Sequence, residues 1–133
     1  ARTRYTSLTY IRYCANNSSM ALELITVVET QSYLAAAKGL LSEAERAAIV
    51  DMVASDPECG IALGGGIRKV RIGVDGRGKR GGARVVYLYA GQDIPVFLMT
   101  VFAKNEMSNL SRSEQAGLAE AAESIIKNYR RRQ

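Results

Sequence analysis

The stretch from Arg68 to Arg84 contains seven basic side chains and one acid, so it carries a charge of +6 in a chain whose total is only +5. The basic residues are Arg68, Lys69, Arg71, Arg77, Lys79, Arg80 and Arg84, and the acid is Asp75. Cations at this density can hold phosphate groups and stabilise negative charge that grows on one of them during a reaction. A concentrated cationic strip inside a folded domain most often contacts a polyanion, and nucleic acid is the commonest one in a cell.

The spacing of these residues predicts that several share one site. Lys69 and Arg71 are two positions apart in the half-apolar stretch 67–73, which is typical of a strand with one exposed face. Arg84 opens the next expected strand and Lys104 follows the third. If consecutive strands pair, the four cations line one concave face. The alternative is a solvated outer face that keeps a sheet edge soluble, but like charges held close together cost folding energy, which favours a ligand-binding role.

Apolar periodicity and capping signals predict one α+β domain with the element order βααβββα. The expected strands are 21–28, 67–73, 83–89 and 95–103. The expected helices are 31–40, a second that opens at Ser42 and must end by Asp56-Pro57, and 112–128. Ser42 and Glu45 stand at capping-box spacing, as do Ser111 and Glu114. We therefore expect an antiparallel meander, with 95–103 at its centre, packed against an αα-hairpin and a C-terminal helix.

Two glycine clusters border these strands, at 64–66 and in the stretch 76–82 (GRGKRGG). Neither matches a phosphate-binding template, because a Walker loop needs Ser or Thr after its lysine and a dinucleotide loop precedes a helix. We expect the first cluster to turn the chain sharply into the basic strand. The second is expected to form a loop in which Arg77, Lys79 and Arg80 reach a long anion without steric conflict.

Composition sets further bounds on the function. The chain has 133 residues, 47% of them apolar, so it can bury one core. No apolar run approaches the roughly 20 residues of a membrane span, and we expect a cytoplasmic location without membrane association. Cys14 and Cys59 are far apart and there is no histidine, so zinc and disulfide chemistry are not expected. We predict no metal and no cofactor.

Residues 1–19 contain no acid and end just before Met20. We interpret them as a leader or extension outside the core fold, which places the domain at 20–133. The alternative is that the stretch 8–13, which is rich in β-favouring residues, adds an edge strand or engages a partner.

Three blocks in this order, GGGIRKVRI, GRGKRGGARVVYLY and VFLMTVFAKNEMSNLS, resemble the RelE/HigB toxins of type II toxin–antitoxin systems. The resemblance runs from about Met20 to the closing helix and is nearest to the HigB subgroup, which carries a Lys-Asn-Glu segment after its last strand. It implies the compact RelE-like fold related to microbial ribonucleases. It also implies a metal-independent endoribonuclease that cleaves mRNA on the ribosome and is silenced by a cognate antitoxin, which we expect to be a helix-turn-helix protein.

The resemblance also implies roles for individual residues. Lys69, Arg71, Arg84 and Lys104 take the catalytic positions that contact the phosphate and the transition state. Arg68, Arg77, Lys79, Arg80 and Asn105 are expected to bind RNA, and Asn105 stands where better-known members have an arginine.

RNA cleavage of this kind also needs a base for the 2′-hydroxyl and an acid for the 5′-oxygen. The C-terminal tyrosine that some members use is absent, because the aligned stretch reads Asn109-Leu110-Ser111. Glu106 is a possible acid or base, or else an ion-pair partner. A lysine crowded by other cations could also serve, because desolvation and neighbouring positive charge lower its pKa. Tyr87 and Tyr89 are expected to pack in the core rather than stack on bases.

Two other functions fit the basic strip. A non-catalytic RNA-binding or ribosome-associated module needs no acid or base, and its affinity would fall with salt at a log–log slope of about −3 for roughly four phosphate contacts on single-stranded RNA. A protein-interaction subunit would accept an acidic peptide in the same groove, which an antitoxin would also cover.

Overall fold

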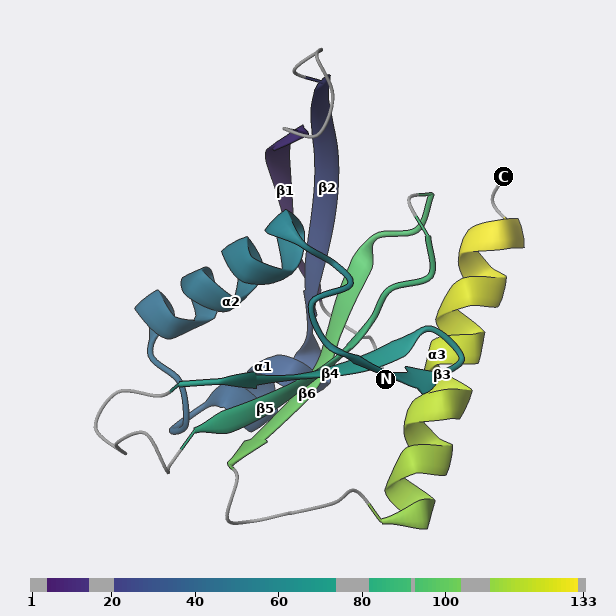
Figure 1. The fold of residues 1–133 in the computed structure, drawn as a ribbon. Helices are drawn as coiled ribbons and strands as arrows, with labels where there is room; N and C mark the ends of the chain where they lie inside the picture. The colour runs from purple at the N-terminus through teal and green to yellow at the C-terminus, as the bar shows by residue number, and fades with distance from the viewer. Residues whose placement is uncertain (1–4, 15–20, 74–81, 92, 104–110, 132–133) are drawn as a thin grey trace.

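The computed structural model describes residues 5–14, 21–73, 82–91, 93–103 and 111–131, which form a mixed sheet with helices on both faces (Figure 1). Its strands follow the order β1-β2-β6-β5-β4-β3 across the sheet. They are β1 Tyr5–Cys14, β2 Ala21–Thr30, β3 Ile61–Gly64, β4 Ile67–Ile72, β5 Ala83–Leu88 and β6 Val96–Ala103. The helices of the described ranges are α1 Gln31–Ala37, α2 Glu43–Ser55 and α3 Arg112–Arg131. The α+β class predicted from the sequence is confirmed.

The predicted antiparallel meander is formed by β4, β5 and β6. The rest of the sheet adds two pairings that the sequence pattern did not predict. Strand β2 runs parallel to β6, with residues 27–29 opposite 96–98, and β3 folds back antiparallel onto β4. Parallel neighbours need a long crossover connection, and the chain from α1 to β5 supplies it. The sheet is therefore mixed, and β6 lies inside it as expected.

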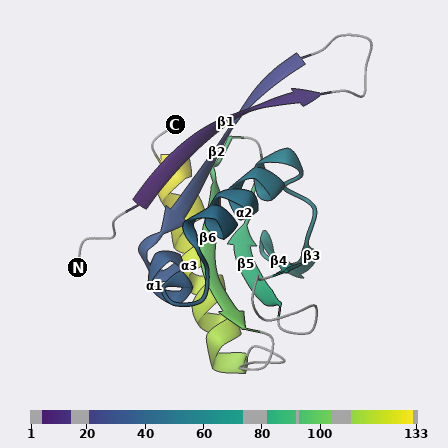
Figure 2. The ribbon, with the colours of Figure 1, turned by 90° about the vertical axis from the view of Figure 1, so that its left-hand side faces the viewer.

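Both faces of the meander are buried, because α1 and α2 cover one face and α3 covers the other (Figure 2). Successive side chains of a strand point to opposite faces. In β5, Val85 and Tyr87 belong to the core under α2, whereas Val86 and Leu88 belong to the core under α3. Burial on two sides also explains why β6 is almost wholly apolar.

A β-bulge in β6 determines which of its residues face α3. The strand carries one extra residue, Met99, between its pairings with Val86 and Tyr87. Met99 and its neighbour Thr100 both line the groove beside α3, and the alternation resumes with Phe102 in the core under α3. If the same residues alternated regularly along the strand, with no bulge, Phe102 would point toward α2.

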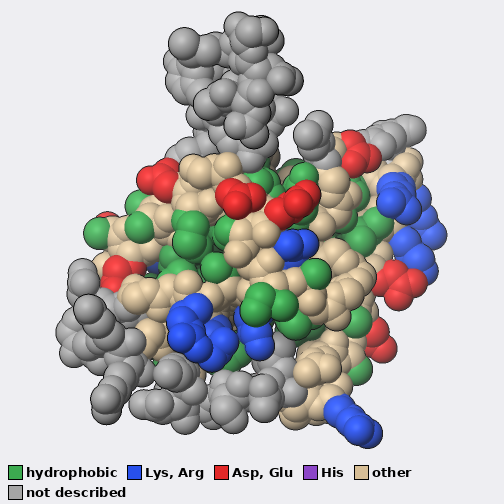
Figure 3. Space-filling view, viewed as in Figure 1, with side chains coloured by type: hydrophobic (Ala, Val, Ile, Leu, Met, Phe, Trp, Pro, Cys, Tyr) green, Lys and Arg blue, Asp and Glu red, His purple; other side chains and the backbone are tan. Residues whose placement is uncertain are grey.

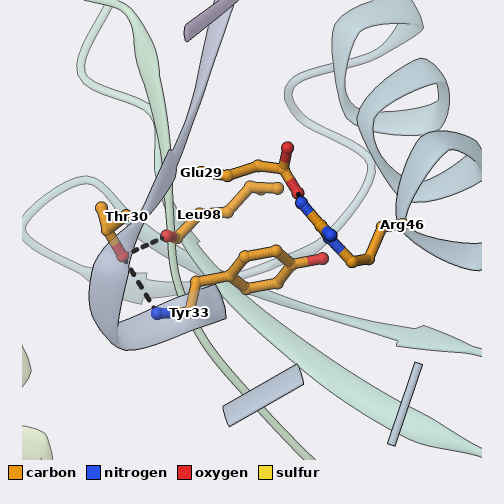
Figure 4. A network of polar contacts seen from close by, with 5 residues as sticks. All are labelled: Glu29, Thr30, Tyr33, Arg46 and Leu98. Carbon is orange, nitrogen blue, oxygen red and sulfur yellow. Dashed lines mark hydrogen bonds and ion pairs between the residues drawn. The ribbon is translucent and has the colours of Figure 1, made fainter. Parts of the chain in front are cut away.

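A small polar network holds the corner between β2 and α1 (Figure 4). Thr30 caps α1, because its hydroxyl oxygen accepts from the Tyr33 backbone N–H at 3.2 Å while the same hydroxyl donates to the Leu98 carbonyl at 2.7 Å. Glu29 is only 3% exposed and forms an ion pair with Arg46 of α2 at 2.9 Å. Burial, together with the Glu29 charge, raises the pKa of Tyr33 far above its usual range. The network connects β2, β6 and α2.

Strand β1 pairs with the whole length of β2 and forms one edge of the sheet. Since β2 pairs with β6 only over 27–29, the far part of the β1–β2 hairpin extends beyond the sheet (Figures 1 and 2). This pairing corresponds to the edge-strand alternative for 8–13. The domain boundary at residue 20 stays a prediction, because the pairing does not show whether the fold depends on residues 1–19.

Replacing Arg46 with alanine would leave the buried Glu29 carboxylate without its partner. We expect the free energy of unfolding, measured by urea denaturation, to fall by about 3 kcal/mol, as for buried ion pairs that lose one member. Lys127→Ala is the matched control. It breaks an ion pair with Glu123 in which both side chains are about two-thirds exposed, so it should cost less than about 0.5 kcal/mol. Equal losses in the two variants would contradict the role given to the Glu29 pair.

Candidate functional site: a cationic face on the sheet

Lys69 and Arg71 lie on the side of β4 that faces α3. Ile67 at the start of β4 belongs to the core under α3, whereas Val70 and Ile72 pack against the core under α2. By strand alternation, Lys69 and Arg71 therefore share the face of Ile67. Lys69 is half-buried and Arg71 is exposed. The alternation predicted for the stretch 67–73 is confirmed.

Arg84 joins these two residues from β5. It pairs directly with Arg71, so the two Cβ atoms are about 5 Å apart on the same face of the sheet. The Arg84 Nε is buried and has no hydrogen-bond partner among the described residues. We call Lys69, Arg71 and Arg84 together the cationic face. Within the described ranges, no carboxylate forms an ion pair with any of the three. A buried donor without a partner, beside two further cations, is the arrangement that a bound anion would complete.

The surface between these cations is apolar. Phe102 of β6 pairs with Arg84, and Val86 of β5 pairs with Lys69. Both belong to the core under α3, with exposures of 8% and 0%. Apolar surroundings lower the local dielectric, so each cation interacts more strongly with a phosphate than it would in water. Figure 3 shows Lys and Arg side chains gathered beside β4, and a separate group at the C-terminal end of α3.

Arg68 belongs to the same strand but faces the other way. Its Nη2 donates hydrogen bonds to the carbonyl oxygens of Glu58 at 3.0 Å and Gly60 at 2.8 Å. These bonds hold the segment between α2 and β3 against the sheet. Arg68 is therefore not grouped with the cationic face, and the geometry gives it a structural role. The RNA-binding role expected for it stays a prediction.

Tyr87 lies in the core under α2, on the side of the sheet away from the cationic face. Its hydroxyl donates to the Pro57 carbonyl at 2.8 Å and accepts from the Gly60 N–H at 3.1 Å. Burial, aided by the hydrogen bond with the Cys59 thiol, raises the pKa of Tyr87 to about 12. Tyr89 is half-buried against the same core. The packing role predicted for both tyrosines is confirmed.

Glycine permits close backbone approach at both ends of β4. The three glycines of the turn 64–66 have φ values of 101°, 64° and 87°, which only glycine adopts readily. They form the predicted turn into the basic strand. At the other end, a Cβ on Gly82 would lie 2.5 Å from the Ile72 carbonyl oxygen. Glycine there lets β5 begin directly beside the end of β4, and this brings Arg84 into register.

Six of the predicted site residues lie outside the described ranges. They are Arg77, Lys79 and Arg80 between β4 and β5, and Lys104, Asn105 and Glu106 after β6. The first stretch connects the two strands that carry the cationic face, and the second follows Ala103, which pairs with Ala83 at the start of β5. The roles expected for these six residues stay predictions.

Sequence reasoning missed two neighbours of the cationic face. Phe102 was assigned to a strand but not to the site, because only the pairing register places it opposite Arg84. Ile61 of β3 pairs with Lys69. The available signal was the short run Ile-Ala-Leu before the glycine turn, which is too short for a test of periodicity.

Comparison with known families identifies the class of protein to which this fold and site belong. The profile of the RelE toxin of the RelE/RelB toxin–antitoxin system matches residues 37–132, which include all of β3 to β6 and all of α3. The chain therefore belongs to the RelE toxin family, a family of toxins of toxin–antitoxin systems. Strands β1 and β2 precede the matched range. In the described part of the chain, no helix has the length and apolar character that crossing a membrane would require.

Replacing Tyr87 with phenylalanine removes the hydroxyl that holds the segment 57–60. We expect the free energy of unfolding to fall by about 1–2 kcal/mol at neutral pH, because two hydrogen bonds to the backbone are lost together with the weaker one to the Cys59 thiol. The pKa of Tyr87 is about 12 in the folded protein and ~10 in the unfolded chain. The extra stability of the parent is thus complete below pH ~10 and is lost as pH rises toward 12. Urea titrations of both proteins across that range check this, and a constant difference between them would contradict it.

Proposed function

We propose that this RelE-family chain is an endoribonuclease that cleaves mRNA on the ribosome, as in the HigB type, and is neutralised by a cognate antitoxin. The observation that carries the proposal is the cationic face: Lys69 and Arg71 from one strand and Arg84 from the next share one side of the sheet. A buried Arg84 Nε without a partner among the described residues supports an anionic ligand there. The nearest chemical fit is an RNA phosphodiester.

The chemistry requires stabilisation of a phosphate whose negative charge grows as the 2′-oxygen attacks. Lys69, Arg71 and Arg84 would supply this without a metal, because fixed guanidinium and ammonium groups can donate hydrogen bonds to the equatorial oxygens. The mutual repulsion of Arg71 and Arg84, which costs folding energy in the free protein, would be relieved when the phosphate binds. Their contribution would be greatest in the transition state, where the phosphate charge is largest.

Cleavage also requires an acid and a base. Tyr87 is not a candidate, because its hydroxyl is bonded in the core under α2 and its pKa is about 12. Glu106 remains the proposed acid or base, with Lys104 as the fourth catalytic cation. The ribosome would hold the mRNA in a fixed geometry, so orientation of the 2′-hydroxyl need not come from the toxin alone.

A non-catalytic RNA-binding module remains the second candidate, because the cationic face is sufficient for binding and no base is assigned to it. The two functions differ in the fate of the RNA. Under the second, mRNA would be bound with the salt dependence given above and would stay intact. We further propose a cytoplasmic location and a helix-turn-helix antitoxin, which an adjacent reading frame of that type would support.

Single alanine substitutions of Lys69, Arg71, Arg84 and Lys104 test the proposal. Each variant of the full chain is expressed from an inducible promoter, and new 5′ ends in cellular mRNA are measured by primer extension. We expect cleavage to fall by roughly 10²–10³-fold for a residue that stabilises the transition-state charge. Lys38→Ala is the matched control, since it removes one exposed positive charge after α1, on the other side of the sheet.

The control should cleave like the parent. If all four variants remain fully active while the parent cleaves mRNA, the catalytic assignment is wrong. If the parent accumulates without cleaving mRNA or slowing growth, the endoribonuclease proposal itself fails.

A further inference from the structure

Strand β1 forms an edge of the sheet without the features that normally keep edges unpaired. It is ten residues long and pairs with β2 on one side. On its other side, no strand of the described ranges meets its backbone N–H and C=O groups. The strand contains no proline, no glycine and no acid, and its one charged residue is Arg12. Long edges without proline or repeated charge pair readily with other strands.

The outer part of the β1–β2 hairpin is incomplete as a sheet. Strand β2 pairs with β6 only at 27–29, and these residues lie opposite 6–8 of β1. The remainder, 9–14 paired with 21–26, is a two-stranded ribbon that extends away from the body of the sheet (Figure 2). A two-stranded ribbon is at best marginally stable in water, and a third strand stabilises it. The free edge of β1 is where that strand can be added.

The pairing with β2 determines on which side of the sheet each position of β1 lies. Leu8 pairs with Val27, which belongs to the core under α2. Paired residues share a face, and successive residues of a strand alternate between faces. Positions 8 and 10 are therefore on the α2 side, and Thr9 is on the α3 side. The α2 side of β1 thus has the apolar positions Leu8 and Tyr10, whereas Thr9 on the other side is polar.

A second copy of the same chain can supply the missing strand. When two identical strands pair antiparallel about a two-fold axis, each residue lies opposite one on its own face, so even-numbered residues pair with even and odd with odd. Pairing about Thr9 obeys this rule and joins 5–13 of the two copies. Registers centred farther from the middle of β1 join fewer residues.

The register about Thr9 is also self-complementary in its side-chain types. It places Leu8 of each copy opposite Tyr10 of the other, and aromatic–aliphatic pairs stabilise neighbouring strands. It places Arg12 opposite Thr6, so no like charges meet. The next allowed register, about Tyr10, would instead place Leu8 opposite Arg12. This self-complementarity identifies a second copy as the occupant, and RNA is excluded because it has no peptide backbone to add as a strand.

We propose that β1 is a self-association surface through which two copies of this chain form a symmetric dimer, with one sheet continuous through both. Residues 9–13 of each ribbon lie along 5–9 of the other copy, where β2 is held against β6. The contact therefore gives each extended ribbon its third strand. Strands β2 and β6 separate β1 from β5, so the contact leaves the cationic face uncovered. The inference concerns assembly and does not rest on the proposed function.

Sedimentation and amide hydrogen exchange of the full chain test whether the dimer forms through β1. One strand against one strand is a small interface, so we expect a monomer–dimer equilibrium with a dissociation constant of about 10–100 µM. Exchange within 5–13 should slow as the protein concentration rises, whereas 61–64, on the opposite edge of the sheet, should exchange at a constant rate. A monomer at every concentration up to ~1 mM, or a dimer that does not protect 5–13, would overturn the proposal.

Charged substitutions at Thr9 test the register, because Thr9 lies opposite itself in the dimer. Thr9→Lys and Thr9→Glu each place two like charges about 5 Å apart, so each variant alone should dimerise about fivefold more weakly than the parent. An equimolar mixture should form a heterodimer of the two variants at least as tightly as the parent dimer, measured by energy transfer between differently labelled chains. Such recovery also shows that both variants fold. A mixture that dimerises no better than either variant alone would overturn the proposal.

Ser7 provides the matched control on the same strand and the same side of the sheet. The register places it opposite Ile11 of the second copy, so the two Ser7 positions are about 14 Å apart, beyond the screening length of ~8 Å at physiological ionic strength. Ser7→Lys and Ser7→Glu should therefore dimerise equally well alone and mixed. A preference for the mixed pair as strong as that at Thr9 would place the two-fold axis elsewhere and overturn the register.

Discussion

The direct pairing of Arg71 with Arg84 across β4 and β5 is the interaction on which the candidate site depends. Two guanidinium groups on neighbouring strands repel each other, and the sheet keeps them together only because the intervening residues are anchored in cores. Val70 and Ile72 pack under α2, and Val85 does the same from β5. A slip of one residue in this register would move these side chains to the α3 face and carry the cations into the core under α2. Core packing thus determines the face of the sheet on which Arg71 and Arg84 lie.

The two cores have different consequences for the site. Side chains of the core under α2 hold the meander in its orientation. One of them is Tyr87, which also makes hydrogen bonds to the segment 57–60. The core under α3 provides the apolar surroundings of the cations, including Phe102 opposite Arg84. The bulge at Met99 connects the two, because it determines which residues of β6 belong to each. The packing of these two cores therefore holds the site rigidly, although the site has few polar neighbours.

Much of this arrangement could be predicted from the sequence. Alternation in the stretch 67–73 placed Lys69 and Arg71 on one face, and the glycine clusters located both ends of β4. The long-range features could not be predicted from local patterns. The parallel pairing of β2 with β6 depends on the crossover, the bulge at Met99 is invisible in an apolar run, and β3 is too short to show a period. Arg68 was grouped with its neighbours because charge counts do not distinguish the two faces of a strand.

The central claim is that Arg71 and Arg84 act on the same phosphate. A double-mutant cycle for mRNA cleavage tests it most directly, using Arg71→Ala, Arg84→Ala and the double variant at equal protein levels. Residues that act as a unit show strongly non-additive effects. The account predicts that the double variant loses little more activity than the worse single variant. If the two losses multiply as independent effects, the cations do not share a substrate group, and the proposed site is incorrect.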